Sequence, residues 1–179
     1  EPVVFSHGLL FSGHMFDAQV AALRGRFRCI TYDHRGQGRS DVPAVESIDM
    51  ETLYEDAVAL VEQLGVAPCH FIGLSMGGFV GMRIAARRPE LLRSLVLLAT
   101  SGDAEAAQTA SRYKLLNFIA RWIGLRPVAP SVMRIMFGRT FLADPSRASL
   151  RHEWRQQLVA NRRELWRAAN GVVRRQSVH

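Results

Sequence analysis

Up to about residue 100, short continuous apolar runs alternate with segments whose apolar positions recur every three or four residues. Runs of this length are typical of strands covered on both faces, and the wider spacing is typical of amphipathic helices. The pattern predicts strands at 2–8, 28–33, 66–73 and 92–100, with helices between them at 13–27, 49–65 and 76–88. Because such alternation forms crossover units, we expect an α/β protein with a mostly parallel four-stranded sheet.

Helix boundaries are marked most clearly around 49–65. Asp49 is the expected N-cap, because its side chain can accept a hydrogen bond from the unpaired amides of the first turn. Gly65 is the expected stop. Pro89 marks the end of the helix that follows Ser75, since the residue before a proline is disfavoured in helical conformation.

Beyond Thr100 the sequence predicts helices and no further strand. Helical periodicity covers 112–124, 131–142 and 150–175, and Pro127, Pro130 and Pro145 separate these segments. We therefore expect a core at 1–103 followed by a helical cap or lid at 104–179. Its apolar stripes fit either a pocket lining or packing between lid helices, and packing is the preferred interpretation. These stripes contain Leu115, Phe118, Ile119, Trp122, Met133, Ile135, Met136 and Phe137.

Net charge is +7 and is unevenly distributed. Residues 1–105 contain 9 Arg and 13 acidic residues, giving −4, and residues 106–179 contain 14 Lys and Arg against 3 acidic residues, giving +11. Solvated helix faces explain this excess better than a functional basic patch. The arginines fall singly or in pairs without interleaved aromatics, so no nucleic-acid partner is predicted.

No apolar run approaches the 18 residues that would predict a membrane span, and no membrane partner is predicted. No leader is visible, so a cytoplasmic location is expected. The first residue is Glu1 rather than Met, and the true amino terminus is expected to be missing with any signal it carried. Cys29 and Cys69 each lie in an apolar run and are expected to be buried, reduced thiols that offer no metal site.

The stretch Gly73-Leu74-Ser75-Met76-Gly77 lies between a predicted strand and a predicted helix. A residue on so sharp a turn has little room beside it, and glycines two positions before and after relieve the crowding. A serine held out at the sheet edge in this way is a candidate nucleophile. The alternative is a serine that is simply packed in a tight turn.

Three segments together resemble the alpha/beta-hydrolase fold family, in its lactonase, esterase and cofactor-free haloperoxidase branch. They are VVFSHGLLFSGHMFDAQV, YDHRGQGRSDVP and FIGLSMGGFVGMRIAARRPELLRSLVLLATSG. The resemblance implies a partial hydrolase core followed by a cap, and hydrolysis through a covalent intermediate on Ser75. In the family's strand order, the strand near Val3 separates those of Cys29 and Cys69, too far apart for a disulfide.

The resemblance also assigns roles around Ser75. The backbone N–H groups of Leu9 and Met76 would form the oxyanion hole, and their side chains would line the acyl pocket. Gly8 would let the chain cross the top of the sheet. His7 would support this loop, with a role as the base that activates Ser75 as the alternative.

Other residues of these motifs are expected to serve the loops. The turn formed by Asp33, Arg35, Gly36, Gly38 and Ser40 would be fixed by its own hydrogen bonds. Its glycines do not follow the spacing of a dinucleotide loop, so no cofactor is implied. His14, His34 and His70 are interpreted as surface or loop histidines.

The departures from the family concern the rest of the triad. In this fold an acid and then a histidine follow the serine on later strands, and no such strands are predicted here. Asp103 is a weak candidate for the acid, and His152 and His179 are weaker candidates for the base. The chain is therefore expected to be an interior fragment that also lacks strands before Glu1.

Two functions follow from these observations. The first is a serine hydrolase of small carboxylic esters, lactones or thioesters, inactive as the isolated 179-residue chain. The second is a catalytically silent fragment or a ligand-binding module that uses the same pocket. Dehalogenation is disfavoured, because it needs a carboxylate where Ser75 stands. Oligomeric state and substrate identity have no signal in the sequence.

Overall fold

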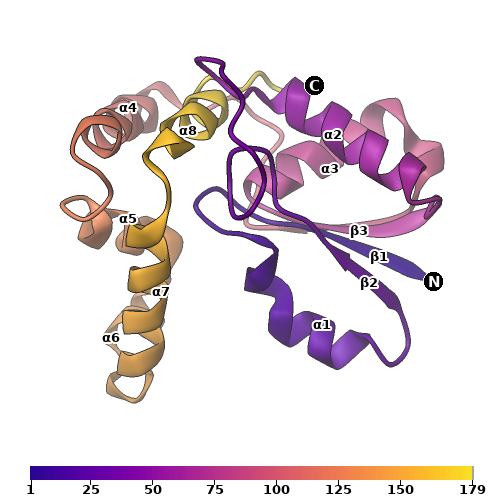
Figure 1. The fold of residues 1–179 in the computed structure, drawn as a ribbon, viewed down its shortest axis with the longest axis horizontal. Coiled ribbons are helices and arrows are strands. Elements are labelled where there is room, and N and C mark those ends of the chain that lie inside the picture. The colour runs from indigo at the N-terminus through magenta and orange to yellow at the C-terminus, as the bar shows by residue number, and fades with distance from the viewer. Residues whose placement is uncertain (179) are drawn as a thin grey trace.

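A computed structural model describes residues 1–178 and contains one parallel sheet of four strands. The strands are β1 (Pro2–Ser6), β2 (Arg28–Thr31), β3 (Cys69–Leu74) and β4 (Leu92–Leu98), in the order β2-β1-β3-β4. Val4 of β1 pairs with Ile30 on one side and Phe71 on the other. The predicted four-stranded α/β sheet is thus confirmed (Figure 1).

Helices cover both faces of this sheet (Figure 1). A short 3-10 helix η1 (Gly13–Phe16) and α1 (Asp17–Leu23) lie on one face, where Phe16 packs with Val3 and Phe5. On the other face α2 (Met50–Gln63) and α3 (Met76–Arg87) enclose the main core. Alternate residues of β1 thus supply two separate apolar layers.

Local signals set most helix ends as predicted. The Asp49 side chain accepts a hydrogen bond from the Thr52 N–H at 2.8 Å, which caps α2, and Gly65 follows that helix with a φ of +59°. α3 ends at Arg87, just before Pro89 and the 3-10 helix η2 (Pro89–Leu91). β3 begins at Cys69, three residues later than predicted, and Pro68 before it has no amide N–H to donate to a neighbouring strand.

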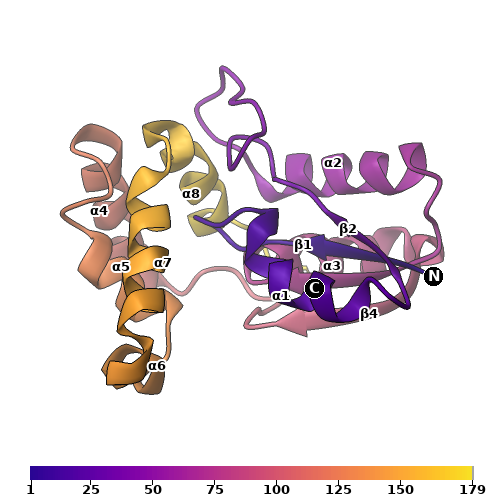
Figure 2. The same ribbon diagram turned by 60° about the horizontal axis from the view of Figure 1, so that its bottom comes forward.

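Within the described part of the chain, residues 107–178 form five α-helices, and short 3-10 helices precede the last two of them (Figure 2). Several of these helices pack around an apolar cluster of their own that includes Val132 and Leu158. Pro130 lies in the first turn of α5 instead of between helices, a position where its missing N–H costs nothing. The elements are α4 (Ala107–Trp122), α5 (Ala129–Met136), α6 (Arg139–Ala143), η3 (Pro145–Arg147), α7 (Ala148–Ala160), η4 (Arg163–Leu165) and α8 (Trp166–Val173).

The last helix, α8, contacts both the cap and the core. Ala168 is fully buried in the core cluster, and the Arg167 carbonyl accepts a hydrogen bond from the Ile48 N–H at 3.1 Å. Gly171 permits this approach, because a Cβ at its position would lie 2.7 Å from the carbonyl carbon of Ile48. The segment 104–179, expected to be a lid, therefore includes a helix that also closes the core.

Both thiols are free as expected, but only Cys69 is buried, and Cys29 is half-buried. Val3 of β1 pairs with Cys29 of β2 on one side and with His70 of β3 on the other. Cys29 and Cys69 are therefore on strands separated by β1, and both are free.

We expect Gly171→Ala to lower the free energy of unfolding by about 1–3 kcal/mol, the usual cost of forcing a methyl group into filled space. Urea unfolding followed by circular dichroism measures the change. Gly138→Ala is the matched control, because a Cβ at Gly138 meets nothing within 4 Å. Equal stability of the two variants would show that α8 does not pack on the Ile48 loop.

Candidate active site

Ser75 occupies the sharp turn between β3 and α3, as predicted. Its backbone has a φ of +50° and a ψ of −110°, outside the regions that residues with a side chain ordinarily adopt. Its N–H donates to the Leu98 carbonyl at 2.9 Å, and its own carbonyl accepts from the Thr100 hydroxyl at 3.0 Å. These bonds to the end of β4 hold a strained backbone in place, a feature that clusters at functional sites.

The glycines on either side of Ser75 are required by close approach of backbone to backbone. A Cβ at Gly73 would lie 2.6 Å from the carbonyl carbon of Gly77. A Cβ at Gly77 would lie 2.5 Å from the carbonyl carbon of Ser6 and 2.7 Å from its hydroxyl oxygen. The turn is thus pressed against both its own helix and the end of β1.

His7 is fully buried directly after β1, and both of its ring nitrogens have partners. Nδ1 donates to the Gly8 carbonyl at 2.8 Å, and Nε2 accepts from the His34 N–H at 2.9 Å. Burial lowers the pKa of His7, so the ring is held in one neutral tautomer. This arrangement fits the supporting role, and it leaves neither nitrogen to act as a base for Ser75.

His34 lies in the loop after β2, so it is a loop histidine as one expectation had it, but it is buried and not at the surface. The side chain is 1% exposed, and its Nε2 lies 2.9 Å from the hydroxyl oxygen of Ser6. Burial places the pKa of His34 well below its usual range, so this ring is also neutral. The turn after β2 folds inward under the β1 loop, which buries a residue that the polar sequence around it suggested was exposed.

That turn is fixed by the Asp33 carboxylate. One oxygen accepts from the Gly13 N–H at 2.7 Å and the other from the Arg39 N–H at 2.8 Å. The Ser40 hydroxyl donates to the Asp33 carbonyl at 2.7 Å. Gly36 and Gly38 have φ values of +77° and +54°. The hydrogen bonds expected of this motif are therefore present.

Gln37 connects the loop after β1 to the Ser75 turn, and the sequence did not identify it. Its side chain is 2% exposed; Oε1 accepts from the Leu10 N–H at 3.0 Å and Nε2 donates to the Met76 sulfur at 3.6 Å. Met76 is fully buried in the core, so its side chain does not line the pocket as expected. The only signal for Gln37 was its place inside the motif at 33–40.

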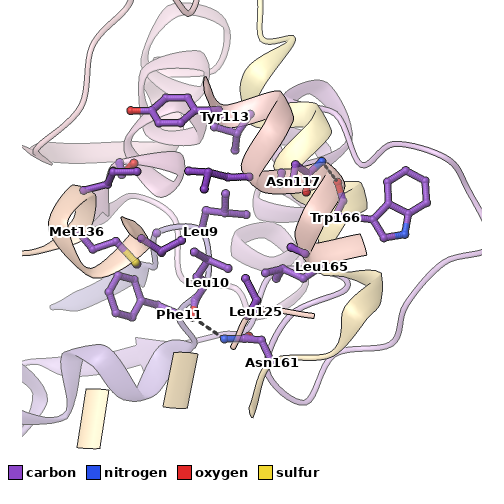
Figure 3. A pocket seen from close by; sticks show the side chains of 18 of the residues that line it. Leu9, Leu10, Phe11, Tyr113, Asn117, Leu125, Met136, Asn161, Leu165 and Trp166 are labelled. Atoms are coloured by element: carbon purple, nitrogen blue, oxygen red, sulfur yellow. Dashed lines mark hydrogen bonds between the residues drawn. The ribbon is translucent and has the colours of Figure 1, made fainter. Parts of the chain in front are cut away.

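A cavity of about 480 Å³ lies between the core and the helical segment (Figure 3). Gly8, Leu9 and Ser75 line it from the core, while α4, α5, α7 and α8 supply the opposite wall. Most of its walls are apolar. Labelled side chains include Leu10, Phe11, Tyr113, Leu125, Met136, Leu165 and Trp166.

Polar side chains in the wall bind one another or the backbone. Asn161 donates to the Leu10 carbonyl at 3.1 Å, and Asn117 donates to the Trp166 carbonyl at 3.0 Å (Figure 3). Arg175 forms an ion pair with Glu105 at 2.6 Å, and the two side chains are 8% and 14% exposed. Because these groups are already paired, the cavity suits an apolar molecule.

The weak acid and base candidates lie away from the cavity. Asp103 is exposed and accepts a hydrogen bond from the Ser101 hydroxyl at 2.8 Å, whereas Glu105 lines the wall. His152 is exposed on α7 beside Gln156. Within residues 1–178, no histidine lines the cavity, and His179 lies outside the described residues.

Among the described residues 1–178, no three or more His, Cys, Asp and Glu side chains form a group that could hold a metal ion. No helix within 1–178 combines the length and the apolar character needed to cross a bilayer.

Comparison with known proteins agrees with this geometry. A model of the alpha/beta hydrolase fold family matches residues 1–172. The chain is 40% identical over 80 residues to 3-oxoadipate enol-lactonase 1 of Acinetobacter baylyi, covering 45% of this chain and 29% of that protein. Its fold superposes with a TM-score of 0.85 on an enol-lactonase from Burkholderia xenovorans, at 26% identity over 96% of this chain and 64% of the other. The fold also superposes on an esterase from Thermogutta terrifontis with a TM-score of 0.85, at 26% identity over 98% of this chain and 64% of the other.

The chain belongs to the alpha/beta hydrolase fold family, as the sequence motifs indicated. Proteins to which it is similar are named as lactonases and esterases. The chain spans between 29% and 41% of the length of the curated relatives that it matches.

We expect Glu105→Gln to destabilise the protein by on the order of 1–3 kcal/mol at pH 7, because it leaves Arg175 without its anionic partner. Burial raises the pKa of Glu105, but hydrogen bonds from Thr109 and Arg175 outweigh it and lower the pKa below 4.5. The ion pair therefore makes its full contribution to the free energy of unfolding above pH 4.5. This contribution is lost as the pH falls through the lower pKa that Glu105 has in the folded state.

Urea unfolding at pH 7 and at pH 3 measures this dependence. The difference between Glu105→Gln and the unsubstituted protein should shrink at the lower pH. Glu46→Gln, which changes an exposed carboxylate in the loop before α2, should have little effect at either pH. A Glu105→Gln difference that is equal at both pH values would contradict the ion pair.

Proposed function

We propose that this chain carries the nucleophile and oxyanion hole of a serine hydrolase that acts on small carboxylic esters, lactones or thioesters. The observation that carries the proposal is the strained backbone of Ser75 at the floor of a mainly apolar cavity. Strain of this kind is retained where it positions a reacting group. The named activities of the enol-lactonase and esterase relatives agree with the proposed substrates.

In the proposed reaction, Ser75 Oγ attacks the substrate carbonyl carbon, and negative charge develops on the carbonyl oxygen. The N–H groups of Leu9 and Met76 donate hydrogen bonds to that oxygen. The adjacent backbone N–H groups are already bonded within the fold: the Ser75 N–H donates to the Leu98 carbonyl, and the Leu10 N–H donates to the Gln37 side chain. Met76 is also the first residue of α3, where amides are unpaired and the helix dipole favours an anion.

The tetrahedral intermediate then expels the alcohol, the thiol or, in a lactone, the ring's own hydroxyl group, leaving an acyl group on Ser75. Attack by water on this acyl group releases the acid and restores the serine. A base must take the Ser75 proton in the first step and deliver it to the leaving group. His7 has no free nitrogen for this, and no histidine within residues 1–178 lines the cavity, so we propose that the base lies outside the described residues.

The alternative function is a binding module without catalysis. The observation in its favour is that no histidine within residues 1–178 lines the cavity. The strained Ser75 turn favours the hydrolase, because binding an apolar molecule requires no such strain.

We expect an organophosphate that phosphorylates activated serines to modify Ser75 in the complete gene product. Ser75→Ala should abolish this labelling and lower kcat for p-nitrophenyl butyrate by several orders of magnitude, because no attacking oxygen remains. Mass spectrometry of tryptic peptides locates the adduct. Labelling at another residue, or undiminished activity in Ser75→Ala, would refute the assignment.

The 179-residue chain alone provides the comparison for this experiment. It should hydrolyse p-nitrophenyl acetate and butyrate no faster than its own Ser75→Ala variant, because residues 1–178 place no histidine at the cavity that could serve as the base. A clear Ser75-dependent turnover by this chain would mean that one of its own residues completes the triad.

We further expect Gln37 to be a positioning residue for the oxyanion hole. Gln37→Leu removes two hydrogen bonds that position the proposed donors. One is to Leu10, the residue after the donor Leu9, and the other is to the side chain of the donor Met76. Misplaced donors weaken stabilisation of the transition state more than binding of the substrate, so kcat should fall about 10-fold or more while KM changes little.

The conservative variant separates positioning from folding. Gln37→Glu retains the acceptor for the Leu10 N–H and should recover part of kcat. The free energies of unfolding of the two variants, measured with urea, should not rank in the same order as their kcat values. A change confined to KM, or kcat values that simply track stability, would contradict the positioning role.

A further inference from the structure

The outer face of α4 exposes three large apolar side chains in a row. Leu115, Phe118 and Trp122 are 60%, 62% and 61% exposed, so these three do not pack between lid helices as expected. Other residues of the predicted stripes, among them Ile119 and Met133, do pack in the cap cluster. Their spacing of three and four residues places them on one face of the helix. The rings of Phe118 and Trp122 have centroids 6.5 Å apart, so they form a continuous apolar strip.

The cavity does not account for this strip. It is lined by the opposite face of α4, through Tyr113, Leu116, Asn117 and Ala120. α4 lies at the end of the molecule farthest from β2, and the cap and the sheet are separated along the long axis (Figure 1). The helix thus has one apolar face that closes the cavity and a second that is open to solvent.

Cations border the exposed strip. Arg112 and Lys114 are exposed on α4, and Arg121 lies beside Trp122, with its guanidinium carbon 5.2 Å from the centre of that ring. Residues 106–143 contain five Arg and one Lys, and no Asp or Glu. Three cations of α4 therefore border the strip, and residues 106–143 contain no carboxylate that could offset them.

We propose that this outer face of α4, defined by Leu115, Phe118 and Trp122, binds the surface of an anionic lipid bilayer. Helices that lie in the membrane interface combine an apolar strip that includes Trp or Phe with Lys and Arg along its borders. Charge complementarity favours an anionic surface. It disfavours a second copy of this chain, because two such faces would bring like charges together.

Binding in this orientation would place the cavity next to the bilayer, with α4 between them. The apolar esters and lactones that suit the cavity also partition into lipid, so the surface would concentrate them. Membrane binding itself is independent of the proposed hydrolysis and can be tested without any enzymatic assay.

The test is sedimentation of the complete gene product with vesicles of phosphatidylcholine alone or mixed with phosphatidylglycerol. We expect binding to the mixed vesicles and at least about 10-fold weaker binding to the neutral ones. Replacing Arg112 and Lys114 with Gln should weaken binding about fivefold for each charge removed. Phe118→Ser with Trp122→Ser should abolish it, and added salt should reduce it.

Leu150→Ser is the matched control, because Leu150 is 43% exposed on α7, outside the strip. It should bind like the unsubstituted protein, and circular dichroism melting checks that every variant is folded. The proposal is overturned if anionic vesicles do not bind the protein or if the double serine variant binds equally well. Self-association lost in Phe118→Ser, measured by analytical ultracentrifugation without vesicle binding, would assign the face to a second copy instead.

Discussion

The contact between the end of β1 and the start of α3 determines the geometry of the site. Gly77 lies so close to the Ser6 backbone that no side chain fits between them. Because α3 is held at this distance, the chain must reverse from β3 into α3 within one residue, and Ser75 takes the strained backbone that results. The same contact brings the first amide of α3 beside the loop that leaves β1, so the two proposed oxyanion donors come from neighbouring elements.

Buried polar side chains then hold that loop. His7 bonds Gly8 within the loop and accepts from His34 in the turn after β2, while Gln37 of that turn reaches both Leu10 and Met76. The bonds of His7 and the bond from Gln37 to Met76 are buried, where leaving one partner unpaired is costly, and the Leu10–Gln37 bond is partly buried. The turn after β2 therefore helps to position the loop after β1, and a change in that turn acts on the proposed oxyanion hole through Leu10 and Met76.

The sequence predicted the elements whose signals are local. Asp49 and Gly65 mark the ends of α2, and the glycines around Ser75 reveal the sharp turn because crowding acts within a few residues. His34 and Gln37 could not be placed in the same way, since a polar residue in a loop is buried only if a distant element covers it. For the same reason α8 was assigned wholly to the lid: its apolar face gives no indication that Ile48, more than a hundred residues earlier, is one of its partners.

The helix α4 shows how an apolar pattern can mislead in the opposite direction. Its apolar residues recur at helical spacing, a pattern for which packing between lid helices was the preferred interpretation. In the structure only the face containing Leu116 and Ala120 is covered. Because Phe118 and Trp122 are exposed to water, the protein lacks the stabilisation that burial of aromatic side chains contributes. A partner that covers this strip would recover that free energy, and the cations along its borders restrict the partner to an anionic surface.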